Sequence, residues 1–95
     1  MRNHTVAILK ALADETRLSL LKEIIAAKEI SCKQLVDKFS LSQPTLSHHF
    51  NKLVDAHVLN ARKQGQSWFY TLNTTYMNTI GFDIKKIVTG KHHHE

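Results

Sequence analysis

The sequence predicts a small, mainly α-helical domain with one β-hairpin, and three observations support this fold class. Apolar residues recur at helical spacings of three and four up to His57. Two segments rich in β-branched and aromatic residues, 58–63 and 67–72, then flank Gln64-Gly65-Gln66, which is a hairpin pattern. Helical spacing returns from Thr74. We therefore expect the order α-α-α-α-β-β-α within one domain that spans residues 1–95.

Capping residues indicate where the first four helices begin. A first helix is expected over about His4–Ala11, and Asp14 is expected to cap the second. Ser31 opens a third, with Gln34 three positions later in capping-box spacing. After a short link, Ser42 caps the fourth. Two short helices joined so closely predict a helix-turn-helix, and the hairpin after them is a wing.

The fourth helix, Ser42–Lys52, is the most informative segment. Leu46, Phe50 and Leu53 fall on one stripe and are expected in the core. The outward face carries hydrogen-bonding groups and no acid, which suits base edges and phosphates in a DNA groove. The alternative is an ordinary helix surface with a capping serine. The candidate base-contacting residues are Gln43, Thr45, Ser47 and His48.

The charge distribution agrees with a polyanionic partner. The chain has a formal net charge of +5, and Asp55 is the only acid between Lys38 and Phe82. A basic, acid-poor segment is what a surface that binds double-stranded DNA needs, although a solvated basic face without a partner has the same composition. The candidate phosphate and wing contacts are Lys38, Ser42, Lys52, Arg62, Lys63, Gln64 and Gln66.

Composition argues against several other classes of protein. No apolar run approaches the ~20 residues that span a bilayer, and no signal-peptide pattern opens the chain, so we expect a cytoplasmic protein without a membrane partner. Cys32 is the single cysteine and cannot form an internal disulfide. No arrangement of nucleophile, base and carboxylate points to an enzyme, and no cofactor is expected.

A heptad-like seam marks the last predicted helix, about residues 74–89, which precedes a tail at 90–95. Its apolar residues are spaced three, four and three, a spacing that suits a partner helix. We expect a homodimer, although the helix could instead pack on the first helix of its own chain. The candidate dimer contacts are Val6, Leu9, Met77, Ile80, Ile84 and Ile87.

Three segments in this order carry a resemblance to a known family. They are Lys10–Leu18 (KALADETRL), Ser42–Phe50 (SQPTLSHHF) and Arg62–Leu72 (RKQGQSWFYTL). Over about residues 9–72 the chain resembles the ArsR/SmtB family of bacterial winged-helix repressors. The resemblance implies a homodimer joined through its first and last helices. It also implies two recognition helices in successive major grooves, and repression often relieved by a small effector.

The metal positions of that family do not match. Its best-known site is a Cys-x-Cys pair in the third helix, where this chain has Ser31, Cys32 and Lys33, so the thiolate pair is absent. Its second site would need a histidine where Lys85 stands. We therefore predict no metal site. Two further features stay open: Cys32 as a redox sensor or a small buried hydrophobe, and His92–His94 as an opportunistic metal-binding tail.

We predict a dimeric, DNA-binding transcriptional repressor, which could repress its own promoter. A two-fold dimer predicts a pseudo-palindromic operator with half-site centres about one helical turn, ~10 bp, apart. One alternative is a repressor that responds to a metal or oxidant at the tail or dimer interface; its effector is unknown. A less favoured alternative is a winged helix used for protein–protein contact.

Overall fold

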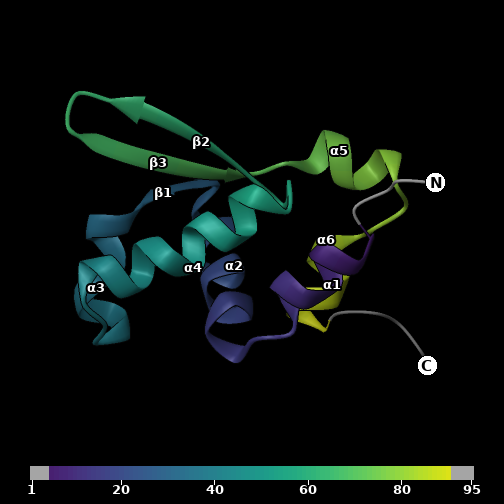
Figure 1. The fold of residues 1–95 in the computed structure, drawn as a ribbon, viewed down its shortest axis with the longest axis horizontal. Coiled ribbons are helices and arrows are strands. Elements are labelled where there is room, and N and C mark those ends of the chain that lie inside the picture. Colours follow the sequence, from purple (N-terminus) through teal and green to yellow (C-terminus); the bar gives the residue numbers. More distant parts are fainter. Residues whose placement is uncertain (1–4, 91–95) are drawn as a thin grey trace.

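The structure is a computed structural model that describes residues 5–90 (Figure 1). The hairpin and α3 lie at one end of the molecule, and α1, α5 and α6 lie at the other. The elements in chain order are α1 (Thr5–Leu12), α2 (Glu15–Ala27), β1 (Glu29–Ser31), α3 (Cys32–Phe39), α4 (Gln43–Asp55), β2 (Leu59–Gln64), β3 (Ser67–Leu72), α5 (Thr74–Thr79) and α6 (Ile84–Thr89).

The predicted helix caps are confirmed. The backbone N–H of Arg17 donates to Asp14 Oδ1 at 3.0 Å, which caps α2. At the start of α3, the Ser31 N–H donates to Gln34 Oε1 at 2.8 Å. Ser42 Oγ accepts from the Thr45 N–H at 3.2 Å and so caps α4. Each cap pairs an amide that has no partner inside its own helix.

One strand was not predicted from the sequence. The short β1 pairs antiparallel with β3, so the sheet has the order β1-β3-β2, and Ile30 lies opposite Tyr70. Three residues are too few to show a strand periodicity, and the strand exists because β3 offers a free edge. Between β2 and β3, Gly65 has a φ of +63°, which a tight two-residue hairpin turn requires.

The predicted core stripe of α4 is confirmed. Leu46, Phe50 and Leu53 are fully buried. The ring of Phe50 stacks on Tyr70 of β3, with centroids 4.1 Å apart and planes 5° apart. Burial also raises the pKa of Tyr70. The sheet therefore holds the inner face of α4 and leaves its outer face to solvent.

The prediction of one continuous last helix is wrong. Gly81, with a φ of +88°, separates α5 from α6, and Asp83 caps α6 by accepting from the Lys86 N–H at 3.1 Å. Met77 and Ile84 are only 1% and 2% exposed and belong to the core of their own chain. The two therefore do not form an exposed seam with Ile80, which is also partly buried against that core.

Candidate nucleic-acid interface

The outer face of α4 carries the predicted base-contacting residues. Gln43, Thr45 and His48 are exposed, whereas Ser47 is half-buried beside α3. Lys52, near the end of the same helix, is also exposed. None of the outward side chains of this helix before Asp55 carries a negative charge, so a DNA phosphate can approach without repulsion.

A hollow separates this helix from the hairpin. It has a volume of about 230 Å³ and receives Gln43 and Ser47 from α4, Lys33 from α3 and Trp68 from the hairpin. Cys32 lies at its floor, where the Sγ atom is 3.8 Å from the Gln43 carbonyl oxygen and 3.8 Å from Ser47 Oγ. Cys32 is buried, so its side chain supports the base-contacting end of α4.

Two of the predicted phosphate contacts are paired with acids. Arg62 Nη2 lies 2.9 Å from Glu29 Oε2, and Arg62 Nη1 donates to Gln64 Oε1 at 2.6 Å. Lys38 Nζ lies 2.9 Å from Glu23 Oε2. Sequence reasoning missed both pairs because each acid lies on a different element, in the nearly balanced first part of the chain. Exposed ion pairs of this kind are weak, so either cation can exchange its partner for a phosphate.

Two further lysine side chains lie near the predicted base-contacting residues and the wing. Lys52 and Lys63 are exposed and form no ion pair with any residue between 5 and 90. The Nζ atom of Lys63 lies 5.9 Å from the centroid of the Trp68 ring. Gln66 is exposed at the hairpin turn. The wing therefore offers hydrogen-bonding and cationic groups on the same side of the hollow.

Trp68 and Tyr70 share one face of β3 but differ in burial. Tyr70 is buried, but Trp68 is 46% exposed at the rim of the hollow. Tyr70 lies under Phe50, whereas Trp68 is closer to the turn, beyond that contact.

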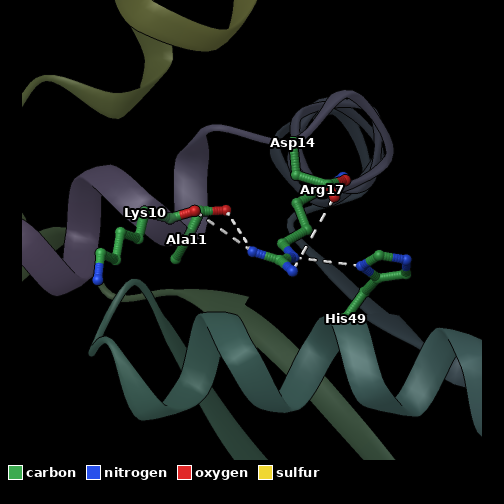
Figure 2. A network of polar contacts seen from close by, with 5 residues as sticks. All are labelled: Lys10, Ala11, Asp14, Arg17 and His49. Carbon is green, nitrogen blue, oxygen red and sulfur yellow. Dashed lines mark hydrogen bonds and ion pairs between the residues drawn. The ribbon is translucent and has the colours of Figure 1, made fainter.

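His48 and His49 face different surroundings, as their adjacent positions on a helix require. His49 lies at the flank of α4, where its Nδ1 accepts from Arg17 Nε at 3.2 Å (Figure 2). Burial lowers the pKa of His49, and the carboxylate of Asp14 partly opposes this shift. The two imidazole centroids are 5.8 Å apart. Arg17 was not among the predicted site residues, because no sequence pattern reveals a contact between two residues that are 32 positions apart.

The described residues hold no cluster suited to a metal ion. Between residues 5 and 90, no three His, Cys, Asp or Glu side chains gather closely enough to hold one. The tail histidines His92–His94 lie outside the described residues. No helix in the same range is long and apolar enough to cross a membrane.

Comparison with known proteins agrees with this geometry. A family model described as "Helix-turn-helix domain" matches residues 12–61. The arsenical resistance operon repressor of Staphylococcus xylosus is 38% identical over 82 residues, which cover 86% of this chain and 78% of that protein. The chain belongs to the ArsR family. It is therefore a DNA-binding transcriptional regulator with a winged helix-turn-helix fold, and not an enzyme.

Solved structures of ArsR-like regulators share this fold. HlyU from Vibrio cholerae, a transcriptional activator, superposes with a TM-score of 0.75 at 33% identity. The superposition covers 93% of this chain and 91% of the HlyU chain. A winged helix-turn-helix domain from Mycobacterium bovis, described as homodimeric, has a TM-score of 0.73 at 22% identity, covering 97% and 87%. The relatives thus include both a repressor and an activator.

Proposed function

We propose that this ArsR-family protein is a cytoplasmic, dimeric repressor that binds a pseudo-palindromic operator, with its own promoter as one target. The outer face of α4, which carries no acid before Asp55, is the observation that carries the proposal. Gln43 can pair with an adenine edge, and Ser47, Thr45 and His48 can donate or accept hydrogen bonds at base edges or phosphates. The basic wing then tracks the adjacent backbone.

Exposed apolar residues support the dimer. Val6 and Leu9 on α1 are 66% and 51% exposed, and Ile87 on α6 is 49% exposed. Both helices, α1 and α6, lie at the end of the molecule away from the hairpin turn (Figure 1). Exposed large apolar side chains on both of these helices favour an interface there. A second copy joined there would present two recognition helices to one face of the duplex.

A mobility-shift assay against DNA from the chain's own upstream region tests the proposal. We expect a shifted complex at low salt, and affinity that falls steeply as salt rises because several phosphates release counterions. The double variant Gln43→Ala, Ser47→Ala, checked for an unchanged circular dichroism spectrum, should lose discrimination between operator and random DNA. Absence of any shift at low salt, with the protein folded, would contradict the proposal. It would favour the alternative of a winged helix used for protein–protein contact.

We also propose that the family's thiolate site is not the switch in this chain. Ser31 is bonded to Gln34, Cys32 is buried under α4, and Lys33 carries a positive charge, so the third helix offers one thiol and no pair. A soft metal needs several thiolate ligands. Stoichiometric arsenite, zinc or cadmium should therefore leave the operator complex intact. Release by zinc that persists in Cys32→Ser would place an effector site elsewhere, such as the tail.

A further inference from the structure

We propose that Arg17 is a positioning residue that fixes the recognition helix α4 against α1 through a neutral His49, and that operator binding weakens when His49 gains a proton. This inference rests on the proposed function, because it concerns how α4 is presented to DNA. Its structural basis is a set of hydrogen bonds that join three helices at one guanidinium (Figure 2).

The first part of the network caps the C-terminal end of α1. The last four carbonyls of a helix have no partner within it. Here the Leu9 carbonyl accepts from the Ala13 N–H at 3.0 Å, and that of Leu12 accepts from the Asp14 N–H at 2.8 Å. The other two carbonyls accept from Arg17 Nη1, at 3.4 Å for Lys10 and 3.2 Å for Ala11. The positive charge of Arg17 also matches the negative end of the α1 dipole.

The second part of the network reaches α4. Arg17 Nε donates to His49 Nδ1 at 3.2 Å, and Arg17 Nη2 lies 4.0 Å from Asp14 Oδ2. Only 14% of the Arg17 side chain is exposed, and its planar guanidinium is held by α1 on one side and by His49 on the other. A lysine offers a single point charge and cannot hold this geometry.

The Arg17 bond fixes the tautomer of neutral His49. A guanidinium always carries its proton, so Nδ1 must accept, and the imidazole proton must be on Nε2. The charged groups that face this ring are Arg17 and Asp14 from α2 and its start, and His48 from its own helix. A proton on Nδ1 would remove the acceptor and place a second cation against Arg17. The carboxylate of Asp14 opposes that repulsion, and burial of the ring is the largest effect that disfavours the proton.

The direction of the pH effect follows. Burial lowers the pKa of His49 from its ordinary 6.5, so the neutral form is the one that the fold favours. The Arg17 contact is present at neutral pH, and it is lost as pH falls through the lowered pKa of His49. His48, a candidate base-contacting residue, is adjacent in sequence, and its ring lies 5.8 Å from that of His49. Displacement of His49 should therefore also displace His48.

Operator affinity measured from pH 8.0 to 5.5 at constant ionic strength tests the inference. His49→Asn keeps an acceptor near the Nδ1 position and does not titrate. Relative to this variant, wild type should lose affinity as pH falls, by roughly threefold at pH 5.5 and by no more than about tenfold at any pH if binding lowers the pKa by one unit. The matched control is His57→Asn, because His57 has a φ of +64° that asparagine adopts readily and lies outside the candidate interface. Its profile should follow wild type.

Nitrogen-15 NMR of the His49 ring gives a readout that needs no DNA. We expect an Nε2–H tautomer that titrates below 6.5, and its loss in Arg17→Lys. An Nδ1–H tautomer, or identical pH profiles for wild type and His49→Asn, would overturn the inference while operator binding stands. Absence of operator binding by every protein at every pH would instead overturn the proposed function, and the NMR would still decide whether Arg17 holds His49.

Discussion

At the scale of single residues, Asp14 combines a helix cap with a charge. Its carboxylate accepts the Arg17 N–H, and this backbone hydrogen bond lowers the pKa of Asp14. A lowered carboxyl pKa contributes stability above the unfolded value of 3.8, and that contribution disappears as pH falls through the folded value.

Replacing Asp14 should reveal both contributions. Asp14→Ala should lower the free energy of unfolding at pH 7 by about 1 kcal/mol, whereas Asp14→Asn should lower it less because asparagine also caps. Urea denaturation at pH 7, 4 and 2.5 checks this. The advantage of wild type over Asp14→Asn should shrink at the acidic end, and the gap between the two variants should stay constant. A wild-type advantage that is the same at pH 7 and 2.5 would show that the charge plays no part.

The residue-scale features that the sequence predicted are the local ones. A cap joins residues three positions apart, so Asp14, Ser31 and Ser42 could be identified from spacing alone. The Arg17–His49 bond and the Arg62–Glu29 ion pair join residues 32 and 33 positions apart. Nothing in the spacing of a single sequence marks them, because the tertiary fold brings their elements together.

At the scale of elements, the break between α5 and α6 shows how one glycine overrides a periodic pattern. The heptad spacing continues across Gly81, but a φ of +88° there cannot belong to a right-handed helix. Met77, Ile80 and Ile84 still turn inward against their own chain, whereas Ile87 is half-exposed, so the pattern identified apolar positions but not what covers each of them. Periodicity reports which side chains are apolar, not whether a second chain or the same chain covers them.

Substitution of Gly81 tests this explanation. A Cβ at this position meets no atom within 4 Å, so the cost of a side chain comes from the backbone alone. Gly81→Ala should destabilise the protein by about 1–2 kcal/mol, and Gly81→Asn by less, because asparagine tolerates left-handed conformations. Urea unfolding at neutral pH measures the difference. If both variants matched wild type, the chain would not need the positive φ.

The pairing of the wing with β1 leads to a prediction about DNA. Glu29 neutralises Arg62, so Glu29→Gln should release the guanidinium toward phosphate. We expect tighter DNA binding at low salt and a salt dependence that is steeper by about one phosphate contact, a slope change of about 0.9. The control is Glu15→Gln, an exposed acid on α2 that removes the same charge. Equal gains in the two variants would mean that net charge alone is responsible.

At the scale of the whole molecule, the two ends have different surfaces. The hydrogen-bonding face of α4 and the wing carry the groups suited to DNA, and Val6, Leu9 and Ile87 are exposed on α1 and α6 at the other end. The Arg17 network lies between them, since it joins the end of α1 to the flank of α4. A change at the proposed dimer surface therefore has a short covalent and hydrogen-bonded route to the recognition helix.

Separating the two copies of the proposed dimer should weaken operator binding far more than it weakens folding. Leu9 is half-exposed in the single chain, so Leu9→Glu costs little within it but places a charge in the proposed interface. Analytical ultracentrifugation should show a monomer, with a melting temperature close to that of Ala26→Glu, an exposed control on α2. Operator affinity should fall by about 10²–10⁴-fold because the second half-site no longer binds intramolecularly. A dimer that persists in Leu9→Glu would move the interface away from α1, and the pseudo-palindromic operator would then need another symmetric arrangement.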